Sequence, residues 1–252
     1  MRAEITDKAE LIFLILTFLF MVGSMTGWVI ELFFRRFIST KNPERKWINP
    51  GFLTGPCLPL YGFGLIALFI MSLLPYVGNN SGVNTPGRIA VTILSMGVMM
   101  TLIEYIAGLI FIKGMKIKLW DYSDEPLNLQ GIICLRFSVI WTVLGAVYYF
   151  LIQPHVIDLV KWFGDNIAFT FVVGMFYGVL VIDLFYSFNV SSRIHEFAVE
   201  NDVVIKYEAL KQEIRTDTDK LKKDWRFLLP LNSDQSLGET MKERLEKIKV
   251  KN

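Results

Sequence analysis

The fold is decided by one polar stretch, Trp120-Asp121-Tyr122-Ser123-Asp124-Glu125-Pro126-Leu127-Asn128-Leu129-Gln130-Gly131, which lies between two long apolar runs. Glu104 lies inside the apolar run before this stretch, and Arg136 lies inside the run after it. Charged side chains are rare and costly in hydrocarbon, and they mark functional sites by default. The stretch is therefore predicted to be part of a site. The alternative is an ordinary membrane loop flanked by one structural ion pair.

The composition places the chain among membrane proteins. Of its 252 residues, 53% are hydrophobic and 14% are aromatic, and the mean hydropathy is +0.43. These values are high for a soluble domain. The net charge of +2 gives no electrostatic reason to expect nucleic acid as a partner. Cys57 and Cys134 have neither zinc-ligand spacing nor the pattern of a disulfide framework, so no metal, cofactor or disulfide is predicted.

Five apolar stretches predict membrane helices, at about 11–34, 59–74, 89–112, 131–152 and 166–189. A helix of about 20 residues crosses a hydrocarbon core of about 30 Å. The first stretch is too long for a signal peptide, and bulky Trp28 stands where a cleavage site needs small residues. We therefore expect an all-α integral membrane domain over residues 1–189. Two glycine pairs, Gly23 with Gly27 and Gly174 with Gly178, have the spacing of close helix packing.

The distribution of lysine and arginine predicts the orientation in the membrane. Five such residues follow the first helix and three follow the third, whereas the other two loops contain only Arg88 and Lys161. The N-terminus is therefore expected outside a bacterial cell membrane and the C-terminus in the cytoplasm.

Two further segments differ from the membrane helices. Residues 47–62 are apolar but rich in proline and glycine, so they are expected to be an irregular segment that dips into the helix bundle. Residues 190–252 form a cytoplasmic tail of soluble character. Val203, Tyr207, Leu210 and Ile214 predict one short amphipathic helix in this tail, and Ser236 with Glu239 resembles a capping box that opens a second one.

An internal repeat relates the two halves of the first four helices. Glu31 and Glu104 lie on helices of the same direction, and each is followed by a basic stretch, a tryptophan and then an asparagine, Asn49 or Asn128. This pattern predicts two parallel hairpins with a fifth helix added, an arrangement that some transporters use.

Polar residues of the membrane helices share one depth. Helical rise places Glu31, Glu104, Arg136 and Asp183 about 5 to 12 Å inside the cytoplasmic face. Each has a structural alternative: Glu31 extends to the interface, Glu104 pairs with Arg136, and Asp183 bonds a neighbouring helix. Together they leave a surplus of negative charge, which is resolved by protonation, by a bound cation, or by Arg35 or Arg36 folding back. The candidate ligand-binding residues are Glu31, Asn49, Tyr61, Glu104, Trp120, Asp121, Tyr122, Asn128, Arg136 and Asp183.

Two blocks of sequence resemble a known bacterial family. The first runs from Gly27 to Glu31 and then over residues 49–62; the second contains Glu104-Tyr105, Leu119-Trp120-Asp121-Tyr122-Ser123, Asn128-Leu129-Gln130-Gly131 and Phe137-Ser138. Over roughly residues 11–150 the chain resembles the ABC-transporter type IV family, also called CmpB-like permeases. The resemblance implies a membrane location and a transport role. It brings no catalytic residues.

Three functions remain open from the sequence. The favoured one is a permease-like transport component with a polar cavity in the cytoplasmic half of the membrane, acting as a homodimer or with a separate ATPase subunit. No phosphate-binding loop motif is present in these residues. The alternatives are a membrane scaffold whose tail recruits a cytoplasmic partner, and an intramembrane enzyme that acts on a lipid head group with Glu104 or Asp121 as general base. The sequence favours a non-enzymatic role.

Overall fold

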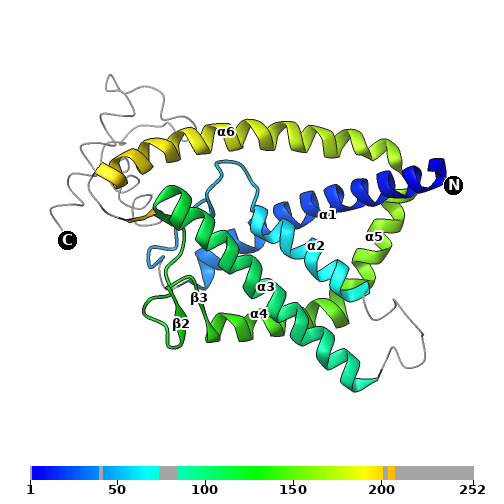
Figure 1. Cartoon of the computed structure of the whole chain (residues 1–252), viewed down its shortest axis with the longest axis horizontal. Helices are drawn as coiled ribbons and strands as arrows, with labels where there is room; N and C mark the ends of the chain where they lie inside the picture. Colours follow the sequence, from blue (N-terminus) through cyan, green and yellow to red (C-terminus); the bar gives the residue numbers. More distant parts are fainter. Residues whose placement is uncertain (1, 40–41, 74–84, 201–203, 208–252) are drawn as a thin grey trace. The chain divides into compact units, whose positions relative to one another are not determined.

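The computed structural model describes residues 2–39, 42–73, 85–200 and 204–207 (Figure 1). The chain divides into two compact units. Unit 1 comprises Met1–Ala107 and Tyr122–Ser187, and unit 2 comprises Gly108–Asp121 and Phe188–Asn252. The boundaries differ from the predicted division at residue 189, because α3 and α6 each contribute to both units.

The described chain is mostly helical. Its helices, named as in Figure 1 where labels are drawn, are α1 (Arg2–Phe37), α2 (Pro59–Leu73), α3 (Pro86–Met115), α4 (Leu135–Val147), the π-helical η2 (Tyr148–Ile152), α5 (Gln153–Asp165), the 3₁₀ turn η3 (Ile167–Phe169) and α6 (Thr170–Glu200). Pro59 and Pro86 each occupy the first position of a helix, where the missing N–H of proline costs no hydrogen bond.

Among the residues that the structure describes, four helical segments are long and apolar enough to cross a membrane: Lys8–Phe37, Pro86–Met115, Leu135–Asp165 and Ile167–Phe188. This agrees with the prediction of a multi-pass α-helical membrane protein. The predicted helix at 59–74 corresponds to α2, a shorter apolar helix of 15 residues. At about 1.5 Å per residue, α2 is about 22 Å long, which is less than the thickness of a hydrocarbon core.

The segment at 153–165, predicted to be a loop, is the helix α5. Its apolar residues Val156, Leu159 and Phe163 recur at helical spacing, and Val156 and Phe163 are buried while Asp158 and Lys161 are exposed. Proline is compatible with the first turn of a helix, and here Pro154 lies at the start of α5, immediately after η2.

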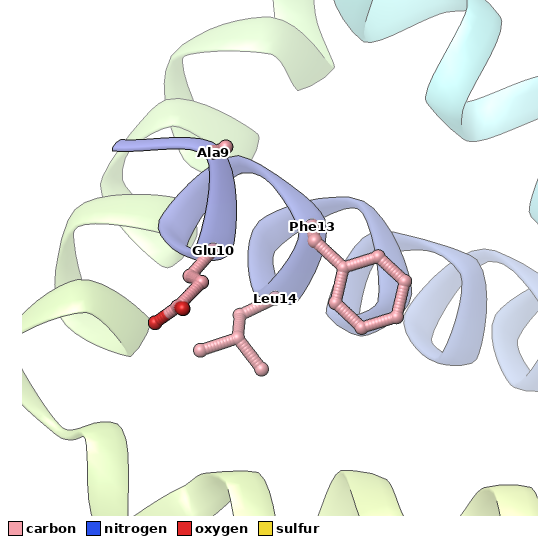
Figure 2. Close-up of a pocket in the computed structure, with 4 residues that line it drawn as sticks. All are labelled: Ala9, Glu10, Phe13 and Leu14. Carbon is pink, nitrogen blue, oxygen red and sulfur yellow. The ribbon is translucent and has the colours of Figure 1, made fainter. Parts of the chain in front are cut away.

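The N-terminal part of α1 bears an open surface depression (Figure 2). It is lined by Ala9, Glu10, Phe13 and Leu14, all from this one helix. Glu10 is the single charged residue of the four.

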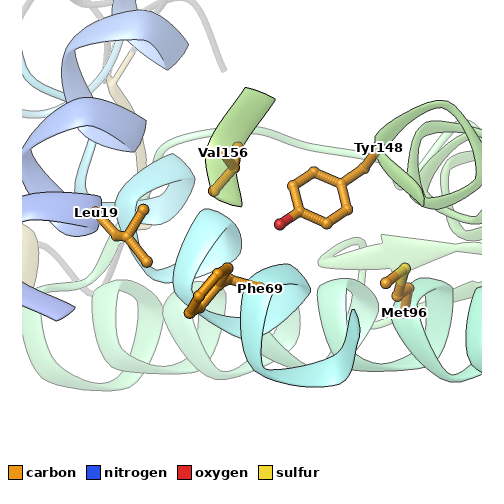
Figure 3. Packing of buried hydrophobic residues seen from close by; sticks show 5 residues of the cluster. All are labelled: Leu19, Phe69, Met96, Tyr148 and Val156. Carbon is orange, nitrogen blue, oxygen red and sulfur yellow. The ribbon is translucent and has the colours of Figure 1, made fainter. Parts of the chain in front are cut away.

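The apolar core of unit 1 brings five helical elements together (Figure 3). One cluster contains Leu19 of α1, Phe69 of α2, Met96 of α3, Tyr148 of η2 and Val156 of α5. A second core cluster joins α1 to α5 and α6, and includes a parallel stack of the Phe18 and Phe163 rings at 4.2 Å between centroids. α1 is thus packed on both sides.

The irregular segment between α1 and α2 is partly buried in unit 1, with Thr54 and Pro56 exposed. Phe52 and Leu53 belong to the buried core, and the N–H of Leu58 donates to the Ser24 carbonyl oxygen of α1 at 3.0 Å. Gly51 has a φ of 81°, which favours glycine at this position.

A small hairpin precedes α4. Strand β2 (Asn128–Leu129) pairs antiparallel with β3 (Ile133–Cys134), in the register Asn128 to Cys134. The turn between them places Gln130 at a φ of 58° and Gly131 at 66°. A left-handed glutamine costs about 1 to 3 kcal/mol, so other contacts must hold this turn.

Unit 2 contains a two-stranded parallel sheet. Strand β1 (Ile117–Lys118) pairs with β4 (Ile205–Lys206), and both isoleucines are buried. The predicted amphipathic helix through Val203 and Tyr207 is therefore wrong at residues 205–206, where parallel pairing with β1 overrides the helical spacing. Its remaining positions, Leu210 and Ile214 among them, and the predicted second tail helix lie outside the described residues. α6 continues to Glu200, beyond the predicted end at residue 189.

Candidate functional site

Glu31 of α1 makes two side-chain contacts in unit 1. Its Oε1 accepts a hydrogen bond from Arg35 Nε at 2.9 Å, and its Oε2 accepts one from the Tyr61 hydroxyl of α2 at 3.1 Å. The side chains of Glu31 and Arg35 are each 22% exposed. The spacing of four residues is that of an ion pair along one helix face, so Glu31 carries its charge next to a matched cation.

Glu104 of α3 has a related arrangement without the cation. Its Oε1 accepts a hydrogen bond from the Tyr122 hydroxyl at 3.0 Å, and its Oε2 accepts one from Trp141 Nε1 of α4 at 2.9 Å. The residue is only 3% exposed. Within the described part of the chain, no lysine, arginine or histidine forms an ion pair with Glu104. It is thus a buried acid held by two neutral donors.

Aromatic rings connect these two carboxylates. The Tyr61 and Trp141 rings meet edge to face at 6.4 Å between centroids, and the Tyr122 ring stacks on Phe137 of α4 at 4.4 Å. Five segments of unit 1, namely α1, α2, α3, the loop that carries Tyr122, and α4, therefore converge on one group of residues. We call it the carboxylate–aromatic cluster, and it comprises Glu31, Arg35, Tyr61, Glu104, Tyr122, Phe137 and Trp141.

The Tyr122 phenol remains neutral within this cluster. Burial, and then the charge of Glu104, raises its pKa above the usual value of 10.0. A neutral hydroxyl can both donate and accept a hydrogen bond, which matters for the carboxyl it contacts.

Close helix packing places Tyr61 beside α1. A Cβ added to Gly27 would overlap the Cβ and ring of Tyr61, and one added to Gly23 would lie 2.8 Å from Leu65 Cβ. The predicted role of this glycine pair is thus supported by the packing of α1 against α2. Nothing described lies within 4 Å of a Cβ added to Gly174 or Gly178, so the predicted close packing at this second pair is not seen in the described residues.

The predicted pairing of Glu104 with Arg136 is wrong. Arg136 Nη1 instead lies 3.0 Å from Glu125 Oε1, with the arginine side chain 66% exposed. Glu104 and Arg136 have similar depths by helical rise. However, Arg136 and Trp141 are five positions apart, which places their side chains about 140° apart around α4. Trp141 contacts α3, and Arg136 therefore points elsewhere.

Asp183 of α6 binds backbone rather than another side-chain charge. Its Oδ1 accepts the N–H of Thr54 at 3.0 Å and its Oδ2 accepts the N–H of Gly55 at 2.9 Å. The Ser187 hydroxyl donates to Oδ1 at 3.2 Å. This group, which we call the Asp183 clamp, fixes the irregular segment to α6 with two hydrogen bonds, and the third bond, from Ser187, lies within α6.

Asn49 and Asn128 each organise a loop. Asn49 Nδ2 donates to the carbonyl oxygens of Leu53 and Thr54, and its Oδ1 accepts Trp28 Nε1 at 2.6 Å. Asn128 Nδ2 donates to the carbonyl oxygens of Ser123 and Glu125, and its Oδ1 accepts the N–H of Gly131. In both residues the Nδ2 group donates to carbonyl oxygens of its own loop, so these hydrogen bonds hold the loop together.

Trp120 and Asp121 belong to unit 2. Asp121 Oδ1 lies 3.3 Å from Lys118 Nζ, and its Oδ2 lies 3.0 Å from Lys206 Nζ of β4. Asp121 therefore joins the two strands of unit 2 through a pair of lysines.

The sequence prediction did not include Trp141 or Phe137, and it named Arg35 only as a group that could fold back. A signal for Trp141 was present, because a buried indole N–H needs an acceptor and Glu104 is the acidic residue of the preceding membrane helix.

The predicted polar cavity receives no support, since the depression of Figure 2 lies 21 residues before Glu31 on α1. That separation corresponds to about 31 Å along the helix.

Both cysteines are buried and free. Cys57 lies between the irregular segment and α2, and burial raises the pKa of its thiol from 9.0 to about 11. Among the described residues, no group of three or more His, Cys, Asp and Glu side chains is placed to hold a metal ion.

Comparison with known proteins gives one match. The family model described as "Putative ABC-transporter type IV" matches residues 18–188, which is more than half of the chain. All members of the carboxylate–aromatic cluster and the Asp183 clamp fall within this range. No curated protein and no solved structure shows a significant match.

Proposed function

Because the chain belongs to the putative ABC-transporter type IV family, we propose that it is a permease-like membrane component of a transport system. The observation that supports this proposal is the carboxylate–aromatic cluster. It gathers polar groups of α1, α2, α3 and α4 among apolar helices, and after Glu31 pairs with Arg35 it retains the buried acid Glu104, which has no ion-pair partner among the described residues. Ionisable groups at such positions in membrane proteins mark substrate or ion pathways.

The proposed solute is small and either polar or cationic. The rings of Tyr61, Tyr122 and Trp141 suit a cationic group, which is attracted by aromatic faces, and Glu104 adds a negative charge whenever it releases its proton. Because Glu104 is buried, binding requires a movement of α4 or of the loop that carries Tyr122. Such movements between packed helices are how transporters expose a site to one side at a time.

We further propose that transport requires a second copy of the chain or a separate ATPase subunit. The four long apolar segments and the short α2 provide few helices for a complete pathway. These 252 residues also contain no phosphate-binding loop motif that would supply ATP hydrolysis. Purification in mild detergent, followed by mass spectrometry of co-purifying proteins and a measurement of particle mass, distinguishes the two arrangements.

The proposed orientation in a bacterial cell membrane has the N-terminus outside and the C-terminus in the cytoplasm. Cysteine placed at the exposed positions Lys113 and Lys161, in a background without the native cysteines, tests it. A membrane-impermeant maleimide added to whole cells should label the Lys161→Cys variant and leave Lys113→Cys unlabelled. Labelling of both or neither position contradicts the orientation.

The transport function is tested in a deletion strain with a broad panel of polar and cationic solutes. Uptake or efflux of at least one solute should change in the deletion strain and return with the wild-type chain. Glu104→Gln should fail to restore it at equal expression. Glu10→Gln, in the depression on α1, is the matched control and should restore it.

Other outcomes of the same strain point to the alternatives. Unchanged movement of all solutes with an altered lipid profile would favour an enzyme that acts on lipid head groups. Unchanged solutes and lipids, with loss of a phenotype on truncation of the tail, would favour a scaffold.

A further inference from the structure

The two tyrosine–glutamate pairs of the cluster differ in one respect. Glu31 has the guanidinium of Arg35 at 2.9 Å, whereas the side-chain hydrogen bonds of Glu104 within the described residues come from the neutral groups of Tyr122 and Trp141. Glu104 is also far more buried, at 3% exposure against 22% for the side chain of Glu31. An ionised carboxylate at such a position has lost its water and has gained no cation. Its charge must be neutralised by another route.

The geometry around Glu104 accommodates a neutral carboxylic acid without any change in position. The indole N–H of Trp141 can only donate, and it donates to Oε2, which serves as acceptor in both charge states. The Tyr122 hydroxyl can donate to an ionised Oε1, or it can accept a hydrogen bond from a protonated Oε1 at the same 3.0 Å distance. Both hydrogen bonds therefore survive the addition of a proton.

Other ligands fit less well. A metal ion or an ammonium group would have to contact an oxygen of a residue that is 3% exposed, with both oxygens already bonded and the Tyr122 ring stacked on Phe137. A proton needs no additional space. We propose that Glu104 is a proton-binding carboxyl group that is protonated at neutral pH, whereas Glu31 is the member of the two pairs that has an ion-pair partner.

The titratable groups around Glu104 come from each neighbouring element. They are Tyr122 in the loop, Cys134 of β3, Tyr61 of α2, and Glu31 with its partner Arg35 of α1. Tyr122 is a neutral phenol, and Glu31 is balanced by Arg35. Arg136 of α4 is engaged by Glu125. The remaining charge near Glu104 is thus small, which leaves protonation as the response to burial.

This proton site does not depend on the proposed transport function, because it rests on the local geometry and holds for any role of the cluster. Infrared spectroscopy of the full chain in a detergent without ester groups tests it directly, because the ester carbonyls of phospholipids absorb in the same region as a protonated acid. Exposed carboxyl groups are ionised at neutral pH, so a carbonyl stretch of a protonated acid reports a buried one. The wild type should show this band, Glu104→Gln should lose it, and Glu31→Gln should retain it.

A second variant tests the proposal if Glu104→Gln does not fold. Trp141→Phe leaves the carboxyl group in place but removes the donor to Oε2, and it should shift the carbonyl band to higher frequency. Loss of an ionised carboxylate band, rather than an acid band, in Glu104→Gln would overturn the proposal. An acid band that neither Glu104→Gln nor Trp141→Phe changes would overturn it as well.

Discussion

Trp141 of α4 donates its indole N–H to the carboxyl of Glu104 on α3 at 2.9 Å. This bond joins two helices that otherwise meet through apolar and small residues, such as Gly97 of α3 against Thr142. It also gives Oε2 of a buried acid its hydrogen-bond donor. The bond between Trp141 and Glu104 should therefore contribute to stability as well as to the site.

The contribution of this bond can be measured with Trp141→Phe, which retains an aromatic ring and removes the N–H. Leaving a buried acceptor without its donor costs about 1 to 3 kcal/mol. The variant should unfold at a lower temperature than the wild type in a detergent melting assay. Trp162→Phe is the matched control, since Trp162 is 45% exposed and its ring contacts Phe169. Equal losses in the two variants would show that the N–H of Trp141 contributes nothing.

Arg136 should be energetically independent of Glu104. Its partner is Glu125, and an exposed ion pair of this kind contributes about 0 to 1 kcal/mol. In a double-mutant cycle on thermal unfolding, Glu104→Gln and Arg136→Gln should add to within about 0.5 kcal/mol. Coupling well above that value would mean that the two side chains interact.

The Asp183 clamp can be opened with Asp183→Asn. An amide offers one oxygen where the carboxylate uses two, so either Thr54 or Gly55 loses its acceptor. The expected loss of stability is about 1 to 3 kcal/mol. Hydrogen exchange should increase at these two amides, with little change in the core of α1. Asp158→Asn is the control, because Asp158 is exposed and pairs only with Lys161 among the described residues. Equal exchange at Thr54 and Gly55 in the two variants would contradict the clamp.

The two glycine pairs give opposite expectations for the same substitution. Gly27→Ala places a Cβ against Tyr61 and should destabilise the protein by about 1 to 3 kcal/mol, as overpacking does. Gly174→Ala meets open space in the middle of a helix and should be neutral or stabilising by up to about 1 kcal/mol. Thermal melting of both variants compares them. A larger loss for Gly174→Ala would indicate that α6 packs against a partner through that face.

Cys57 should react slowly with alkylating reagents. Its thiol pKa is raised by burial to about 11, so little thiolate is present at neutral pH, and the rate should rise as the pH approaches that value. A folded-state pKa above the value of 9.0 for a free thiol means that this group stabilises the fold below about pH 9. That contribution is lost as the pH rises towards 11. Cys57→Ala should abolish this part of the pH dependence in melting experiments. Rapid alkylation of Cys57 at neutral pH would contradict the burial.

The length of the apolar stretches and the positions of the charges predicted the helical membrane architecture. The sequence also brought Glu31, Tyr61, Glu104 and Tyr122 into one candidate set. The structure places these four side chains in one cluster. Partner choice could not be predicted, because helical rise gives the depth of a residue but not the face of the helix on which it lies. For that reason Glu104 was paired with Arg136 instead of Trp141. The helix α5 was missed because the 13 residues that follow the predicted helix 131–152 were interpreted as a connecting loop.

The Asp183 clamp also sets an order of events during synthesis. Thr54 and Asp183 are 129 positions apart, so the irregular segment is made long before its anchor exists. At about 5 to 20 residues per second, the ribosome needs on the order of ten seconds to reach α6. During this interval the amides of Thr54 and Gly55 lack the carboxylate that later binds them. These two hydrogen bonds therefore form only after α6 has been made, which makes this part of the docking of the irregular segment a late step of membrane assembly.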